Sequence, residues 1–250
     1  MDAMTRSSLG TTFNASGQNY SAQRPGYPIE AAAWLTSEDP LDLLDLAAGS
    51  GQLTVVLRSL GHRVVAVEPS PSMLDELRGA GRGAAVRSLA EQLPFASAVF
   101  DAATVATAFH WFDASRALPE IARVLRPGGR LGLVWNTREA DSEWSRGLAE
   151  LLFSVQPPGL EGDWGTRSVE HIWQSPLFDE LEYEEFRHAQ SLSRNALVGL
   201  VTTRSYVIAL APDERRRLLS EVASLYDDAA PTSSPLELTY RAQCWRTHVR

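Results

Sequence analysis

Apolar residues along the first half of the chain gather in short strand-like runs that alternate with segments of helical periodicity. The strand-like runs cover 41–47, 63–68, 84–88, 99–106 and 130–135, and the helix-like segments cover 53–60, 72–78 and 114–125. Strands that alternate with helices predict parallel βαβ units with right-handed crossovers. The pattern therefore predicts an α/β fold built on an open, mostly parallel sheet with helices on both faces.

The alternation breaks at 137–180, where Trp, Pro and Gly are frequent and only 143–155 has helical character. We interpret this segment as an insertion packed over the ends of the strands. Beyond it, strand character returns at 181–188 and 236–244, and helical character at 192–203 and 213–227. The prediction is a seven-stranded sheet with a lid insertion after the fifth strand.

The composition excludes several kinds of binding and catalysis. The chain has 31 Asp+Glu against 23 Lys+Arg, a formal net charge of -8, which argues against a general electrostatic hold on nucleic acid or on anionic lipid. All 23 basic residues are Arg, so Schiff-base and P-loop lysine chemistry is excluded. Any fixed positive charge in a binding site must therefore come from Arg.

The single cysteine and the histidines give no sign of a disulfide or a metal site. Cys244 cannot form an intrachain disulfide, and we expect a small buried hydrophobe rather than a thiol nucleophile there. The histidines outside 109–112 lack metal-ligand spacing, so no metal site is predicted. No segment predicts a signal peptide or a membrane span. We expect a cytoplasmic monomer or homodimer that acts on a small molecule, without a membrane or nucleic-acid partner.

The strongest local signal is the Gly-rich segment Asp45-Leu-Ala-Ala-Gly49-Ser-Gly51, between the first strand and the first helix. Such a turn lets a ligand approach the backbone closely, with helix N–H groups nearby. Asp45 is a charge inside a buried strand, so it must hydrogen-bond a ligand or nearby backbone amides. The segment also begins like a dinucleotide fingerprint, but Thr54 takes the place of the third glycine.

Glu68 ends the second strand, 19 positions after Gly49. A carboxylate at this place can accept hydrogen bonds from two ribose hydroxyls. The alternative is a solvated acid at a strand end. Together with the glycine turn, the spacing favours the ribose interpretation and a nucleotide-like ligand beyond the carboxyl ends of the strands.

In combination, several segments resemble the class I S-adenosylmethionine-dependent methyltransferases of the small-molecule kind. The matching segments are 45–51, VVAVEPSPSM at 64–73, LAEQLP at 89–94, FDAATVATAFHWFD at 100–113 and LRPGGRL at 125–131, with FNASGQNYSAQRPGYP upstream at 13–28. The His-Trp-Phe order at 110–112 resembles one subgroup of this family. The resemblance implies a Rossmann-like sheet, S-adenosyl-L-methionine as the cofactor and a small-molecule methyl acceptor.

The resemblance also implies roles for individual residues around the cofactor. The β-strand and turn residues at the methionine and ribose portions would be Asp45, Ala47, Ala48, Gly49 and Gly51. Glu68 would bind the ribose hydroxyls, Pro69 and Met73 would lie against the adenine, and Ala90 and Glu91 would lie at its edge. Ala106 and Thr107 would line the methionine and sulfonium, and Tyr20 and Arg24 would belong to an N-terminal segment that folds over the cofactor. Ala47-Ala48 replaces the family's commoner Gly-Cys or Gly-Ala.

His110 is the candidate catalytic residue, as a general base for an acceptor that must lose a proton. The alternative is a histidine that hydrogen-bonds the backbone and orients its loop. Arg24 can pair with the cofactor's carboxylate or with a carboxylate of the substrate. Trp144, Trp164, Trp173 and the segment 204–206 are candidates to line an acceptor pocket, and each aromatic side chain also fits plain core packing.

One methyltransferase domain over 1–250 is predicted, with a cofactor-binding core at 13–136, a lid at 137–180, and a part at 181–250 that completes the sheet and the acceptor pocket. The predicted reaction is in-line transfer of a methyl group to a carboxylate, hydroxyl or amine. One alternative is an NAD-dependent oxidoreductase on a similar sheet, against which the missing third glycine and Asp45 count. Another is an S-adenosylmethionine-binding protein without catalysis.

Overall fold

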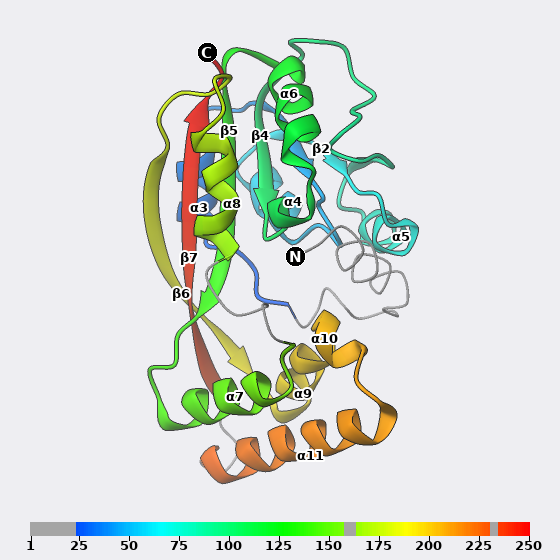
Figure 1. The fold of residues 1–250 in the computed structure, drawn as a ribbon, viewed down its shortest axis with the longest axis vertical. Helices are drawn as coiled ribbons and strands as arrows, with labels where there is room; N and C mark the ends of the chain where they lie inside the picture. The colour runs from blue at the N-terminus through cyan, green and yellow to red at the C-terminus, as the bar shows by residue number, and fades with distance from the viewer. Residues whose placement is uncertain (1–23, 158–163, 231–234) are drawn as a thin grey trace. The chain divides into compact units, whose positions relative to one another are not determined.

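The computed structural model describes residues 24–157, 164–230 and 235–250, whose strands form a seven-stranded sheet in the order β3-β2-β1-β4-β5-β7-β6 (Figure 1). The strands are β1 (Asp42–Leu46), β2 (Arg63–Val67), β3 (Ala84–Val86), β4 (Phe100–Ala106), β5 (Leu125–Arg138), β6 (Glu182–Leu192) and β7 (Leu236–His248). The helices are α3 (Ile29–Leu35), α4 (Gln52–Ser59), α5 (Pro71–Gly79), the short 3-10 helix η2 (Phe109–Trp111), α6 (Ala114–Val124), α7 (Glu143–Ser154), α8 (Trp164–Trp173), α9 (Arg194–Thr202), α10 (Ser205–Ile208) and α11 (Pro212–Ala229). All seven predicted strands are present, and the predicted α/β fold is confirmed.

The sheet is mostly parallel, as predicted. Leu46 of β1 aligns with Val67 of β2 on one side and with Val105 of β4 on the other, in parallel ladders that extend to β3 and β5. The last strand runs the other way, because backbone hydrogen bonds join 128 to 249 and 139 to 239. Residue numbers therefore rise along β5 as they fall along β7, which is the antiparallel pattern.

The described residues fall into two compact units. The sheet unit holds 26–136, 164–186 and 242–250, and it includes all of β1 to β4. The helical unit holds 24–25, 137–157, 187–230 and 235–241. The strands β5, β6 and β7 contribute residues to both units. The predicted insertion at 137–180 is thus shared between the units, and its role as a lid stays a prediction, as do the domain boundaries proposed from the sequence.

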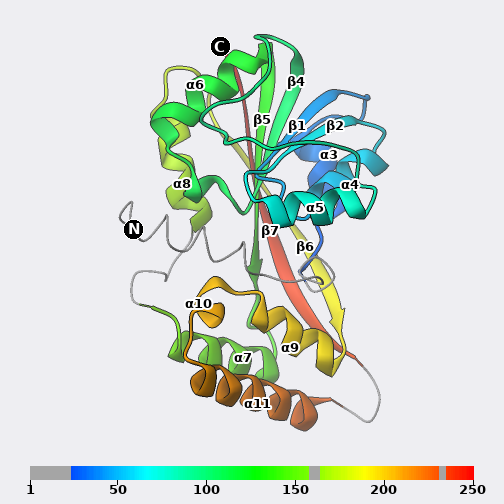
Figure 2. The same ribbon diagram turned by 90° about the vertical axis from the view of Figure 1, so that its right-hand side faces the viewer.

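In the sheet unit, helices cover both faces of the sheet (Figure 2). The helices α6 and α8 lie on one face, and α3, α4 and α5 lie on the other. Alternate side chains of one strand serve the two faces: Leu44 and Leu46 belong to the apolar cluster under α6 and α8, whereas Leu43 belongs to the cluster under α3 and α4. Strands of a parallel sheet that is covered on both faces are nearly continuous apolar runs, which explains the pattern in the sequence.

Three helices escaped the sequence pattern: α3, α8 and α10. The seven residues of α3 follow Pro28 without a side-chain cap, so the usual start signal is missing. Its place is fixed by packing instead, since a Cβ on Gly132 of β5 would lie 3.1 Å from both Cβ and the carbonyl oxygen of Leu35. Only a glycine at this point of the strand lets the helix lie so close.

The segment 126–129, which the sequence pattern leaves between the predicted helix at 114–125 and the predicted strand at 130–135, is part of β5. The backbone N–H of Gly128 donates to the carbonyl of Val249, and the N–H of Val249 donates to that of Gly129. The partner strand is more than a hundred residues away in the chain, so no local pattern reveals it. Pairing with a distant strand here overrides the turn signal of Pro127 and the two glycines.

The helical unit has its own apolar core. Leu148 of α7, Leu197 of α9 and Val222 of α11 are buried in one cluster, together with Leu238 and Tyr240 at the start of β7. Figure 1 shows α7, α9 and α11 gathered together in this unit. The predicted helices at 143–155, 192–203 and 213–227 are confirmed, although Leu192 still belongs to β6.

Candidate functional site

The sheet unit has a switch in strand order between β1 and β4. On one side of β1 the next strands are β2 and β3, and on the other side of β4 the next strand is β5. The connections that follow β1 and β4 therefore cross opposite faces of the sheet. The helix α4 follows β1 on one face and α6 follows β4 on the other (Figure 2). Ligands of open α/β sheets bind beyond the carboxyl ends of the strands at such a switch.

The turn after β1 has an unusual backbone. Ala47, Gly49 and Gly51 all have positive φ, of 51°, 57° and 88°. Space at Gly51 is also tight, because a Cβ there would lie 3.1 Å from the Arg82 side chain and 3.2 Å from that of Leu77, which would have to shift. The turn is closed by the Gly51 N–H, which donates to the carbonyl of Ala48 at 2.8 Å. An alanine in the left-handed region costs about 1 kcal/mol or more, so this turn holds a strained shape at the place where the sequence predicts a ligand.

Glu68 joins this turn to the next one. Its Oε2 accepts a hydrogen bond from the Gly49 N–H at 2.8 Å, and its Oε1 accepts one from the Ser70 N–H at 2.8 Å. The residue is buried, and this burial raises the pKa of the carboxyl although both N–H bonds act to lower it. Each oxygen of an ionised carboxylate has two lone pairs, so one acceptor position on each remains for a ligand.

Asp45 is buried in β1, four residues before Gly49. Thr54 Oγ1 donates to its Oδ2 at 2.5 Å, and Thr104 Oγ1 donates to its Oδ1 at 3.2 Å. Complete burial raises the pKa of Asp45 to about 6, against the lowering effect of these hydroxyls and of the Thr54 backbone N–H. Asp45 therefore ties β1 to α4 and β4, and its direct contact with a cofactor stays a prediction.

The end of β4 has the same backbone strain as the end of β1. Thr107 directly follows β4 with a φ of 52°, as Ala47 directly follows β1. Its N–H donates to the carbonyl of Val134, and its hydroxyl lies 3.1 Å from the hydroxyl of Tyr27. Thr107 is exposed and Ala106 is half-buried. Two strained residues thus stand side by side at the switch between the strands, where strain of this kind is commonly stored for function.

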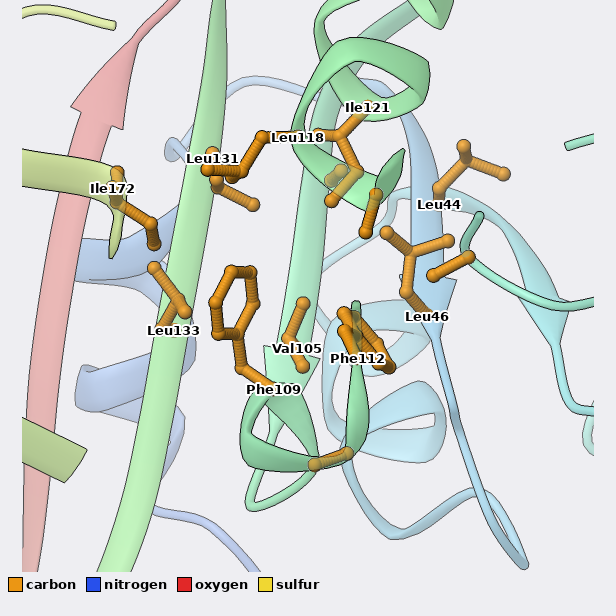
Figure 3. Packing of buried hydrophobic residues seen from close by; sticks show 14 of the residues in the cluster. Leu44, Leu46, Val105, Phe109, Phe112, Leu118, Ile121, Leu131, Leu133 and Ile172 are labelled. Atoms are coloured by element: carbon orange, nitrogen blue, oxygen red, sulfur yellow. The ribbon is translucent and has the colours of Figure 1, made fainter. Parts of the chain in front are cut away.

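His110 lies in a short turn that two buried phenylalanines, Phe109 and Phe112, anchor to the core. Phe109 and Phe112 are buried and point into the apolar cluster near Val105 and Leu133 (Figure 3). These anchors fix the 3-10 turn η2, whose middle residue is His110. The His110 ring lies 4.7 Å from the ring of Trp111, centroid to centroid. Phe112 is therefore core, and the loop that presents His110 is rigidly attached to the sheet just past Thr107.

The remaining predicted residues of the sheet unit lie along the next loops. Pro69 is half-buried after β2, and Met73 is buried in α5 with its sulfur 3.7 Å from where a Cβ on Gly49 would lie. Ala90 is buried. Glu91 is half-buried, and its Oε1 accepts the Asp113 N–H at 2.8 Å, which ties this loop to the start of α6. Met73 and Glu68 thus both lie next to Gly49.

Two predicted residues lie outside this group. Arg24 belongs to the helical unit, where its Nη2 donates to the carbonyl of Thr203 at 2.8 Å. Tyr20 lies outside the residues that the structure describes. Their contact with the cofactor stays a prediction.

Sequence reasoning missed the partners that hold the site together. Thr54 was noted only as a missing glycine, yet its hydroxyl and Thr104 are the side-chain donors to Asp45. Ser70 is the N-cap of α5 but makes no side-chain capping hydrogen bond: its backbone N–H donates to Glu68, and its hydroxyl lies 3.1 Å from that of Ser72. The signal available in the sequence was Asp45 itself, since a carboxyl in an apolar strand requires donors nearby.

Cys244 is buried in β7, and burial raises the pKa of its thiol to about 12, so the prediction of a buried, unreactive cysteine is confirmed. Among the described residues, no three His, Cys, Asp or Glu side chains gather as a metal site would require. In the same part of the chain, none of the helices has the length and apolar character to span a bilayer.

We predict that Asp45→Asn flattens the pH dependence of stability. The folded protein holds the Asp45 proton more tightly than the unfolded chain, so stability is lost as the pH rises from 3.8 through about 6. A shift of that size corresponds to about 3 kcal/mol of unfolding free energy at neutral pH. The amide of Asn avoids this loss and still accepts one threonine hydroxyl.

Urea unfolding of both proteins between about pH 4 and pH 7 measures the difference, which we expect to grow toward pH 7 in favour of the variant. Asp75→Asn, at an exposed acid on α5, serves as the control and should keep the wild-type slope. The same slope in Asp45→Asn and wild type would contradict the assignment.

Comparisons with known proteins agree with this geometry. The family model described as a methyltransferase domain matches residues 44–133, which span the two strained turns and Glu68. An uncharacterized methyltransferase of Mycobacterium tuberculosis is 38% identical over 245 residues, 97% of each chain. An uncharacterized methyltransferase-like protein of Schizosaccharomyces pombe is 30% identical over 246 residues, 94% of this chain and 93% of its own.

A solved structure of a candidate type II methyltransferase from Anaeromyxobacter dehalogenans superimposes with a TM-score of 0.68 at 28% identity, covering 89% of this chain and 97% of its own. Both relatives and the solved structure match this chain over most of its length. The nicotinamide-dependent alternative is thereby set aside. The chain belongs to the class I methyltransferases, enzymes that take their methyl group from S-adenosylmethionine.

Proposed function

We propose that the enzyme methylates a small-molecule acceptor at a carboxylate, hydroxyl or amine, with Glu68 as the anchor of the cofactor. The observation that carries the proposal is the Glu68 carboxylate, which is bound by the N–H groups of Gly49 and Ser70 and keeps one acceptor position on each oxygen. This arrangement stands directly beyond the ends of β1 and β2.

The residues fit the cofactor on chemical grounds. A ribose offers two adjacent hydroxyl donors, and a carboxylate is the acceptor-only group that can take both. Glycine at 49 keeps the backbone open, and Met73 lies next to it as an apolar surface for a flat base. Pro69, Ala90 and Glu91 would border the same base, and Ala47, Ala48, Gly51, Ala106 and Thr107 would face the methionine end.

The protein's part in the reaction is positioning. S-adenosylmethionine supplies, when bound, a methyl group that its sulfonium already activates for displacement. The strained ends of β1 and β4 fix Ala47 and Thr107 in advance of binding. Holding reactants in line in this way can contribute about 7–11 kcal/mol of the barrier. A base is needed only for acceptors that lose a proton, and His110 is the residue that we propose for that step.

We predict that Glu68→Gln weakens the binding of S-adenosylhomocysteine about 10- to 100-fold, or about 1–3 kcal/mol. The amide replaces one acceptor oxygen by an NH2 donor, which cannot take the Gly49 or Ser70 N–H or a hydroxyl in the same way. Isothermal titration measures the affinity, and the melting temperature verifies the fold. Glu30→Gln on the exposed face of α3 is the control and should bind normally.

An unchanged affinity in Glu68→Gln would refute the ribose role. Binding of NAD by the wild type in the same titration, without binding of S-adenosylmethionine, would refute the proposed function as a whole.

We predict that the effect of His110→Gln depends on the acceptor. Phenols and alcohols lose a proton during transfer, and for them we expect a fall in rate of about 10²–10⁴. Carboxylates are already deprotonated at neutral pH and need no base, so their rate should stay within a few-fold. Transfer of a radiolabelled methyl group to a panel of aromatic carboxylates, phenols and amines measures both. Equal losses for carboxylates and phenols, with normal cofactor binding, would show that His110 orients the loop instead.

A further inference from the structure

The segment 26–28, which leads into α3, is tied to the carboxyl ends of β4 and β5. The hydroxyl of Tyr27 lies 3.1 Å from that of Thr107, the residue that follows β4. The carbonyl of Gly26 accepts a hydrogen bond at 2.9 Å from Nδ2 of Asn136 in β5. All four residues belong to the sheet unit, and we call Gly26, Tyr27, Thr107 and Asn136 the clasp.

The ring of Tyr27 is anchored in the core of the sheet unit. It is half-buried and packs against the apolar cluster that contains the buried face of α3 and Val134 of β5. The helix α3 is itself fixed on the sheet by the close approach of Leu35 to Gly132. The Tyr27 hydroxyl therefore reaches the end of β4 from a firmly packed part of the fold.

Thr107 needs support because its backbone is strained. Its φ of 52° lies in the left-handed region, where a β-branched residue is a genuine outlier. Such a conformation persists only where the surrounding structure imposes it. The Thr107 N–H donates to the carbonyl of Val134 at 2.8 Å. Within the described ranges 24–157, 164–230 and 235–250, the Tyr27 hydroxyl is the only hydrogen-bond partner of the Thr107 side chain.

The clasp stands at the switch between β1 and β4. Thr107 directly follows β4 and is exposed, so it is open to a ligand beyond the ends of the strands. In the proposed function, Thr107 faces the methionine end of the cofactor. A residue that is fixed in advance increases affinity, because binding then no longer includes the loss of its conformational freedom.

We propose that Tyr27 is a positioning residue of the cofactor site, which holds Thr107 in its left-handed conformation through the pair of hydroxyls. The inference rests on the proposed function, because it takes Thr107 as a neighbour of the bound cofactor. Without the Tyr27 hydroxyl, Thr107 relaxes toward ordinary backbone angles, and cofactor binding has to restore the strained shape. The contact between Gly26 and Asn136 holds the backbone beside Tyr27 against β5.

The test removes one hydroxyl at a time. Tyr27→Phe and Thr107→Val are compared with the wild type and with Tyr183→Phe, a matched control that removes a hydrogen-bonded tyrosine hydroxyl from β6. Isothermal titration measures the affinity for S-adenosylhomocysteine, and thermal unfolding measures the melting temperature. We expect about tenfold weaker binding in both clasp variants, in line with the loss of one hydrogen bond. The control should bind normally, and all melting temperatures should stay close to that of the wild type.

A double variant and a conservative variant separate positioning from plain stability. Because Tyr27 acts through Thr107, the double variant Tyr27→Phe/Thr107→Val should bind S-adenosylhomocysteine no more weakly than Thr107→Val alone. Thr107→Ser keeps the hydroxyl that Tyr27 contacts, so it should restore binding to within a few-fold of the wild type.

The proposal is overturned if Tyr27→Phe binds S-adenosylhomocysteine as the wild type does, whatever its melting temperature, since Tyr27 is then at most a structural residue. It is also overturned if the losses add in the double variant, because the two residues then act independently, or if Thr107→Ser binds as weakly as Thr107→Val. The comparison of these two Thr107 variants decides in the same way if Tyr27→Phe does not fold. A wild type that fails to bind S-adenosylhomocysteine contradicts the proposed function, and with it this inference.

Discussion

The site depends on one buried carboxylate, that of Glu68, and on the two backbone N–H groups that it accepts. The Gly49 and Ser70 N–H groups belong to two different strand-to-helix turns, and Glu68 ties them together. Each of these N–H groups donates to Glu68 rather than to a carbonyl of the following helix, so the hydrogen bond to Glu68 helps to fix the shape of each turn. The same contacts stabilise the ionised carboxylate against the burial that raises its pKa. The four lone pairs of this carboxylate thus serve the two backbone contacts and, in the complex that we propose, the ribose hydroxyls.

Several residues around this contact are in energetically unfavourable states. Asp45 is buried with a pKa of about 6, and Ala47 and Thr107 have backbone angles that favour glycine. Each stands at or beside the carboxyl end of β1 or β4, where the strand order switches. Elsewhere in the sheet unit the packing is regular, with alternate residues buried under the helices of each face. These three unfavourable terms lie at the switch point where we propose that the cofactor binds, and the apolar layers offset them.

The sequence predicts the parallel strands well, because β1, β2 and β4 are short apolar runs that alternate with segments of helical periodicity. It also singles out Glu68 as a ligand-binding candidate, since a carboxylate at the end of the second strand, 19 positions after Gly49, can accept ribose hydroxyls. It fails where the reason is long-range: the pairing of Gly128 with Val249, and the close approach of α3 that Gly132 allows.

The central claim is that Glu68 binds the ribose while it keeps its two backbone contacts. A crystal structure of the protein with S-adenosylhomocysteine measures this directly. We expect both ribose hydroxyls at about 2.5–3.0 Å from the Glu68 oxygens, with the Gly49 and Ser70 N–H bonds unchanged. A bound ligand whose ribose hydroxyls lie elsewhere, or a Glu68 side chain that has left Gly49, would contradict the account.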